Sequence, residues 1–374
     1  MNALVQTCIV IGVFWGNRAL LVGIVRAVMI EGDIVSVQVM PYRFSGRTQF
    51  AEVSSGVFLV DLPTPQAIGS TNSFIFKADG IHDNGRSLIV DTGCNNPLTK
   101  ETFDKALACL DISWDSVDVF ITHFHWDHCA GLDQIWQPGM TVYAGIDSVS
   151  KHGTPVMAAE EIGAIERNTS AFFDANDSYD PEYWQPMTIN GEKDIPLTVV
   201  HEGQSISVGN YVLEVLETPG HDLHHVCLLD KQAKLLVAGD QVLYSQNPPI
   251  MMESIEEDQL GIMLDTLKRL SILDVDLVLC GHGQEGHDLS ARCYKVLDHY
   301  RRQLDSFKKI CLDDPECSDI GKISYLSTHS GKRTYWEDRL IFGRRALLAQ
   351  NMAYAKHLVT IGELPDIYEI VSLR

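Results

Sequence analysis

The sequence predicts an α/β protein built as an αββα sandwich, with a small, mainly helical part at its C-terminal end. Three observations lead to this prediction. Short β-rich runs separated by Pro, Gly and Asn dominate from about residue 56, and apolar residues take up helical spacing after residue 257. The residues with unusual chemistry stand at the ends of predicted strands, where a layered fold can bring them together.

The predicted strands are short runs of apolar and β-branched residues bounded by turn residues. The run at 118–125 predicts a buried strand that leads directly into a cluster of histidines. The full set covers residues 56–62, 72–78, 87–93, 118–125, 141–144, 197–200, 211–217, 225–229, 234–238 and 276–283.

Four segments show the apolar spacing of helices. The third follows Asp288, a candidate N-cap, and the fourth stops at Gly362, a typical helix terminator. The apolar stripes are Phe103, Ala106, Leu107 and Leu110; Leu260, Leu264, Leu267 and Leu270; Val296, Tyr300, Leu304, Phe307 and Cys311; and Leu348, Met352, Ala355 and Val359.

Composition narrows the class of protein. A chain of 374 residues that is 45% hydrophobic can bury a large core. Its 29 Lys and Arg against 50 Asp and Glu give a formal charge of −21, which disfavours nucleic acid as a partner. The nine cysteines form no CxxC pair, so we predict reduced thiols in a cytoplasmic protein.

We divide the chain into three parts. Residues 1–40 are interpreted as a poorly packed extension of doubtful structure or as the product of an upstream start, with Met29 or Met40 as the start; an export signal fits less well. Their apolar runs are too short for a membrane-spanning helix, so no stable membrane insertion is expected. Residues 41–286 are predicted to form the sandwich domain, with an insertion at about 150–192, and residues 287–374 the helical domain.

The segment THFHWDHCAG at 122–131 carries the strongest chemical signal. His123 and His125 lie two positions apart after a strand and can point the same way, while Asp127 and His128 follow on the next turn. Neutral imidazoles and carboxylates are zinc ligands. One turn can therefore serve two adjacent metal ions.

Three further ligand candidates stand at strand ends downstream. They are His221, Asp240 and His282, and each has a glycine beside it that permits close backbone approach. Together with the first cluster they supply five imidazoles and two carboxylates.

The order of the motifs HFHWDH, TPGH, GD and GH, with DTG at 91–93 upstream, resembles the metallo-β-lactamase-fold hydrolases over residues 50–285. The resemblance implies that a first metal is held by His123, His125 and His221, and a second by Asp127, His128 and His282. It also implies that Asp240 bridges the two ions and that Asp91 orients ligands from behind. His225 precedes a strand and is interpreted as a structural or supporting residue.

The chemistry predicted for such a site is hydrolysis. Two divalent ions, most simply zinc, with iron or manganese as alternatives, can share a water and convert it to hydroxide at neutral pH. Asp127 can also orient this hydroxide, so Asp127 and Asp240 are the predicted catalytic carboxylates.

The fold does not choose the substrate. The presence of Asp240 where some β-lactamases have cysteine, together with the acidic charge, favours a glyoxalase II-like hydrolase that acts on a thioester or ester of a small acyl molecule. A metal-dependent endoribonuclease or phosphodiesterase and a lactonase stay as alternatives, as does a protein that keeps the fold without catalysis. The tail resembles the winged-helix-like domain of glyoxalase II-like and β-lactamase-like protein 2 relatives.

The roles of three groups of residues stay open. Tyr244 and Asn247 follow the bridging Asp240 and are candidate substrate contacts. Aromatic residues in the insertion can either cover an acyl substrate or anchor the insertion. The basic runs at 299–303, 306–309, 331–333 and 343–345 can either hold an anionic substrate group or form a solvated helix face.

Overall fold

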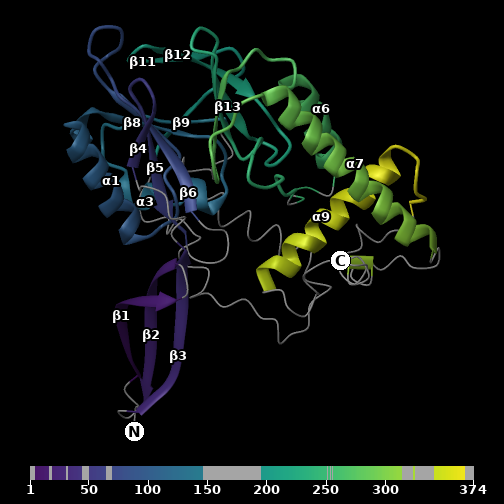
Figure 1. Cartoon of the computed structure of the whole chain (residues 1–374), viewed down its shortest axis with the longest axis horizontal. Helices are drawn as coiled ribbons and strands as arrows, with labels where there is room; N and C mark the ends of the chain where they lie inside the picture. The colour runs from purple at the N-terminus through teal and green to yellow at the C-terminus, as the bar shows by residue number, and fades with distance from the viewer. Residues whose placement is uncertain are drawn as a thin grey trace.

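The computed structural model describes residues 5–16, 19–30, 33–43, 50–64, 70–145, 195–250, 252, 254, 256–313, 323–324 and 341–366. The predicted insertion at 150–192 and the basic run at 331–333 lie outside these residues. Within them, strands form three separate sheets. Figure 1 shows the two larger sheets with α1 and α3 on one side and α6, α7 and α9 on the other.

The first large sheet has seven strands in the order β10-β9-β8-β7-β6-β5-β4. Strands β7 to β10 run parallel, so their carboxyl ends meet at one edge of the sheet. The strands are β4 (Phe50–Ser54), β5 (Val57–Pro63), β6 (Ser70–Phe76), β7 (Ser87–Val90), β8 (Val117–Ile121), β9 (Val142–Ala144) and β10 (Leu197–Val199).

The second large sheet has five strands in sequence order, and its last two strands are parallel. Their carboxyl ends therefore also lie together. The strands are β11 (Ser205–Val208), β12 (Tyr211–Glu217), β13 (Val226–Asp230), β14 (Leu235–Gly239) and β15 (Leu277–Cys280).

The helices follow the predicted stripes closely. In α1, Asn96 caps the first turn by accepting from the backbone N–H of Leu98, and Pro97 occupies the first helical position. Asp288 accepts from the backbone N–H of Ala291 as an N-cap does, and Gly362 has the left-handed backbone that ends the last helix. The helices are α1 (Pro97–Leu110), α2 (Trp126–Cys129), α3 (Leu132–Ile135), α6 (Gln259–Leu270), α7 (Leu289–Asp313) and α9 (Ile341–Thr360).

Three apolar clusters separate the layers and confirm the αββα sandwich. One lies between the two sheets, for example Phe120 of β8 against Leu228 of β13. A second packs α1 and α3 on the outer face of the first sheet. Alternate residues of each strand enter different clusters, as in β14, where Leu235 faces the other sheet and Leu236 faces the helices. Both faces of central strands such as β8, β13 and β14 are buried, which explains their nearly continuous apolar sequences.

The third cluster joins the C-terminal helices to the second sheet. It runs without a break from Leu229 and Leu236 through Leu260 of α6 to Tyr300 of α7 and Met352 of α9. These helices therefore share a core with the sandwich. The winged-helix character of the tail and the limits of the two domains stay predictions.

The N-terminal segment holds strands that the sequence analysis did not assign. They are β1 (Val5–Gly16), β2 (Ala19–Ile30) and β3 (Asp33–Arg43), which pair as an antiparallel meander that shares no strand with the other sheets. Figure 1 shows this meander standing apart from the sandwich. Among the described residues, no helix is long and apolar enough to span a membrane.

Candidate metal centre

Both sheets send loops to one edge, where the predicted ligands meet. The first sheet contributes the turn after β8: the strand ends at Ile121, His123 and His125 follow, and Asp127 and His128 lie in the single turn of α2. The second sheet contributes His221 between β12 and β13, Asp240 after β14 and His282 after β15. The predicted ligands are thus brought together from separate parts of the chain, all in buried positions.

The first cluster consists of His123, His125 and His221. One ring nitrogen of each lies within 4.8 Å of the others, which is close enough for a single ion to bind all three. Nε2 of His221 is 2.8 Å from Nδ1 of His125. This close approach of two imidazoles from different sheets defines the centre of the cluster.

The second cluster consists of Asp127, His128 and His282, whose ligand atoms also lie within 4.8 Å of one another. Nε2 of His282 is 3.1 Å from Oδ2 of Asp127 and 3.4 Å from Nε2 of His128. Unlike the first cluster, this one contains a carboxylate of its own.

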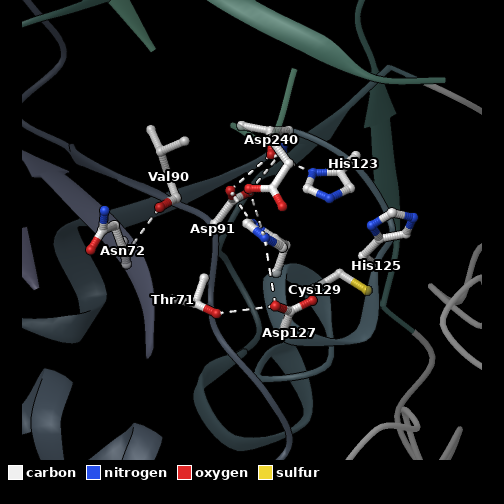
Figure 2. Close-up of polar contacts among 12 residues, drawn as sticks. Thr71, Asn72, Val90, Asp91, His123, His125, Asp127, Cys129 and Asp240 are labelled. Atoms are coloured by element: carbon white, nitrogen blue, oxygen red, sulfur yellow. Dashed lines mark hydrogen bonds and ion pairs between the residues drawn. The ribbon is translucent and has the colours of Figure 1, made fainter. Parts of the chain in front are cut away.

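Asp240 lies between the two clusters. Its Oδ2 is 3.3 Å from Nε2 of His282 and 3.7 Å from Nε2 of His221, and its Oδ1 is 3.5 Å from Nε2 of His128. Figure 2 shows Asp240, Asp127, His123 and His125 gathered around one small space. A carboxylate in this position can contact ions in both clusters.

In several imidazoles, the ring nitrogen that points away from the cluster is hydrogen-bonded to a neighbouring group. This hydrogen bond decides which nitrogen faces the cluster. Nδ1 of His221 donates to the carbonyl of Pro249 at 2.8 Å, and Nδ1 of His282 donates to the carbonyl of Ser70 at 2.8 Å. A carbonyl only accepts, so in both rings Nδ1 carries the proton and Nε2 offers its lone pair to the cluster.

Asp91 supports a histidine of each cluster. Its Oδ2 accepts from Nδ1 of His128 at 2.8 Å and from the hydroxyl of Thr122 at 2.8 Å. The Thr122 oxygen is in turn 2.9 Å from Nδ1 of His123. Since the hydroxyl of Thr122 donates its proton to Asp91, the hydroxyl oxygen accepts from Nδ1 of His123. This leaves Nε2 of His123 available to bind a metal ion. The position of Asp91 fits the supporting role predicted for it.

His225 supports the site from the second sheet. Its Nε2 accepts from the backbone N–H of Asp240 at 3.2 Å, while its Nδ1 is 2.9 Å from the hydroxyl of Thr218. Both ring nitrogens are therefore engaged in positioning the chain around Asp240. The neighbouring His224 is exposed.

Two of the glycines beside the ligands are required by close packing. A side chain at Gly281 would collide with the carboxylate of Asp240 and the ring of His128. A side chain at Gly239, which has a φ of 47°, would collide with His225 and Thr122. This is the close backbone approach that the sequence predicted for glycines next to the ligands.

Electrostatics differ between the clusters. Burial, followed by the nearby imidazoles of His128 and His125, holds the pKa of His123 well below its usual value, and burial likewise lowers the pKa values of His125 and His221. Burial would also lower the pKa of His282, but Asp240 and Asp127 hold it well above its usual value. Burial opposes ionisation of Asp127, yet His128 and His282 lower its pKa to about 2.

The buried polar atoms of the centre fit a metal. Nε2 of His123 and Oδ1 of Asp240 are buried and have no hydrogen-bond partner in the described part of the chain. An unpaired buried polar atom costs free energy, and metal ions bound in the two clusters would satisfy these atoms. Five imidazoles and two carboxylates are also the donor set that zinc, iron and manganese accept.

The structure also shows supporting residues that the sequence analysis missed. Thr71 of β6 donates to Oδ2 of Asp127 at 3.3 Å, a contact drawn in Figure 2, and Asn72 donates to the carbonyls of Cys280 and Gly283 on either side of His282. Gln259 of α6 donates to the carbonyl of His221 at 3.2 Å. Only Thr122, at the end of a strand beside the motif, had a local signal; the others come from distant elements.

Tyr244 and Asn247 lie in the loop after Asp240, on the side of α7. The ring of Tyr244 packs against Gly286, and Oδ1 of Asn247 accepts from Arg292 at 2.9 Å. Substrate contact stays a prediction for both residues.

Three basic residues in the runs at 299–303 and 306–309 of α7 are paired with acidic neighbours. Arg301 lies 2.8 Å from Asp298, and Arg302 lies 3.0 Å from the same carboxyl group. Lys308 lies 3.0 Å from Glu363. These pairs favour the interpretation of these runs as a solvated helix face.

Comparisons with known proteins agree with the site. The model of the metallo-beta-lactamase superfamily matches residues 68–282, more than half of the chain. The chain is 25% identical to the probable metallo-hydrolase YqjP of Bacillus subtilis over 76% of this chain and 97% of that protein. It is 23% identical to a hydroxyacylglutathione hydrolase of Francisella tularensis subsp. novicida, over 63% of this chain and 67% of that protein.

The fold is also found among solved structures. The metallo-beta-lactamase family protein TTHA1429 of Thermus thermophilus superposes with a TM-score of 0.64 at 22% identity, covering 83% of this chain and 95% of that one. The likeness therefore extends well beyond the motif-bearing segment.

Proposed function

This chain belongs to the metallo-β-lactamase superfamily of metallohydrolases, and we propose that it hydrolyses a thioester or ester of a small acyl molecule with two metal ions. One observation carries the proposal: two buried ligand clusters lie side by side with the carboxylate of Asp240 between them. This arrangement offers two adjacent ligand sets, as a binuclear hydrolase requires.

We assign the ligands by the clusters. His123, His125 and His221 would hold one ion, and Asp127, His128 and His282 would hold the other. Asp240, which lies close to His221, His128 and His282, would contact both. Zinc is the proposed native metal because imidazole-rich sites suit it, with iron and manganese as alternatives. When bound, the ions act as Lewis acids and lower the pKa of water towards neutrality.

The chain's own residues then orient the reaction. Asp127 accepts a hydrogen bond from the hydroxyl of Thr71 at 3.3 Å, which fixes its carboxylate at the edge of the site. We propose that it orients the attacking water. Asp91 and His225 keep the ligands in place through His128 and the backbone of Asp240.

Three observations support an acyl substrate over a phosphodiester or RNA. The net charge of −21 repels a polyanion, and the arginines of α7 that could attract one are paired with Asp298. One relative is named for the hydrolysis of hydroxyacylglutathione. Separately, Asp240 stands where the sequence analysis associated a cysteine with zinc β-lactamases, which argues against a β-lactam substrate.

We also propose a cytoplasmic location, which rests on the thiols. The cysteines in the described part of the chain are all free, and six of the seven are buried. Free thiols persist in a reducing compartment.

The experiment combines elemental analysis with a substrate panel. Protein purified without added metal is assayed for zinc, iron and manganese and for hydrolysis of acyl-glutathione, acyl-CoA, lactone, bis-phosphodiester and short RNA substrates. We expect two metals per chain and thioester or ester turnover that is lost in Asp240→Ala. Turnover of RNA or phosphodiester alone would overturn the acyl assignment, and turnover that survives in Asp240→Ala would overturn the metal mechanism.

A further inference from the structure

The loop that follows Asp240 carries the backbone acceptor for one metal-ligand histidine. The carbonyl of Pro249 accepts from Nδ1 of His221 at 2.8 Å. This hydrogen bond selects the tautomer of His221 and the direction of its ring. Whatever holds Pro249 in place therefore also holds His221.

Helix α7 holds this loop from the opposite side. The hydroxyl of Tyr300, a fully buried residue, donates to the carbonyl of Pro248 at 2.5 Å. Pro248 and Pro249 are consecutive, and each ring fixes its own φ, so the position of one carbonyl constrains the next.

Arg292 adds a second attachment from α7. Its guanidinium donates to the carbonyls of Leu243 and Gln246 and to the side chain of Asn247, the last at 2.9 Å. Burial lowers the pKa of Arg292. A partly buried guanidinium group needs hydrogen bonds to offset the cost of its desolvation. Because the N–H groups of Arg292 donate to this one loop, Arg292 anchors the loop to α7.

We propose that Tyr300 and Arg292 are positioning residues for His221, so that α7 sets the geometry of the three-histidine cluster through the loop at residues 241–250. The proposal rests on the metal role of His221 given above and is independent of the substrate. The second cluster lacks this link, because Nδ1 of His282 is held by Ser70 of β6. Ser245 of the same loop packs against Gly283 beside His282, so we expect the larger effect of α7, rather than its only effect, on the cluster that contains His221.

The main test uses Tyr300→Phe, which removes one oxygen and keeps the ring in the core. Tyr354→Phe is the matched control, because Tyr354 is also buried and its hydroxyl bonds to Gln350 within α9, away from the loop. Full-length protein stripped of metal is titrated with Co²⁺ against a competing chelator, and the visible spectrum follows each binding step.

We expect Tyr300→Phe to weaken one of the two Co²⁺ binding steps by about tenfold. This is the smallest loss of metal affinity usually seen when a residue that supports a metal ligand is removed. The other step should stay within about twofold, and Tyr354→Phe should match the wild type. In a His221→Ala background, adding Tyr300→Phe should cause no further loss. Arg292→Met provides the same comparison if Tyr300→Phe folds poorly.

Three results would overturn the inference. Tyr300→Phe could bind Co²⁺ as the wild type does, it could weaken binding equally in the His221→Ala background, or Tyr354→Phe could have the same effect. If the wild-type protein binds no Co²⁺, both the metal mechanism and the inference are refuted. If the wild type binds two Co²⁺ ions and the Tyr300 and Arg292 variants bind them equally well, only the inference is refuted.

Discussion

The three-histidine cluster and the cluster of Asp127, His128 and His282 lie side by side but have opposite electrostatics. The first is built from neutral imidazoles whose pKa values are lowered by burial. In the second, the carboxylates of Asp240 and Asp127 overcome burial and raise the pKa values of His128 and His282. The two positions therefore offer different donor sets, and the one with more carboxylate suits harder metals better.

The clusters also differ in how they are supported. His221 depends on a loop that is bound to α7, whereas Asp127 and His282 depend on Thr71 and Ser70 of β6. Asp240 and Asp91 are common to both. The comparison shows which substitutions should affect one cluster and which should affect the pair.

The largest effect is expected from Asp240→Ala, because this carboxylate contacts a histidine of each cluster. We expect bound metal to fall at both positions and hydrolysis to fall by more than about a hundredfold, the upper end of what loss of a supporting group causes. Metal analysis and turnover of the same sample measure both. His201→Ala, an exposed histidine, is the control; a variant that keeps two metals would show that Asp240 is not a bridge.

His221→Ala and His282→Ala should each remove the ion of a single cluster. Because each ring serves only one of them, we expect each variant to keep the metal at the other position. Metal content after dialysis, followed by Co²⁺ spectra that differ between the two variants, distinguishes the positions. Identical spectra from the two variants would mean that the clusters do not act as separate sites.

Asp91→Asn should weaken both positions by a smaller factor. Both oxygens of Asp91 accept hydrogen bonds, Oδ1 from the backbone N–H of Thr122 and Oδ2 from His128 and the Thr122 hydroxyl. The amide has only one acceptor oxygen and must lose one of these sets, so we expect a loss of about 10- to 100-fold in metal affinity. Competition titration measures it. Asp230→Asn is the control, since Asp230 is equally buried but binds only backbone N–H groups of the second sheet; an equal loss in that variant would argue for a general effect on folding.

The smallest effect is expected from Thr71→Val, which removes the 3.3 Å hydrogen bond to Asp127. A hydrogen bond to a charged group contributes about 1.5–3 kcal/mol at most, and this long one contributes less, so we expect a several-fold loss confined to the second cluster. The Co²⁺ titration resolves the step concerned. Thr102→Val, on the surface side of α1, should leave both steps unchanged.

Much of the candidate site could be predicted from sequence because the ligands sit in short motifs at strand ends. The strand that ends at Ile121 and the turn of α2 follow each other directly in the chain. The sequence spacing therefore already implies that two pairs of side chains, His123 with His125 and Asp127 with His128, point to two different metal positions. Most strands of the sandwich were predictable because both of their faces are buried and their sequences are largely apolar, whereas the short, partly exposed strands β4 and β11 were missed. Local spacing also predicted that Gly281 allows close packing beside a ligand.

The sequence by itself determined the element types of the sandwich, the αββα layering and the family to which the ligand motifs belong, because these depend on periodicity and on residues that are neighbours in the chain. Only the tertiary structure decided which groups stand behind the ligands. Asn72 donates to the carbonyl of Cys280, 208 positions away in the sequence and close to His282. Tyr300 donates to the carbonyl of Pro248, 52 positions away, in the loop that holds His221. Such contacts leave no local pattern, since they arise from how the two sheets and α7 pack rather than from spacing along the chain.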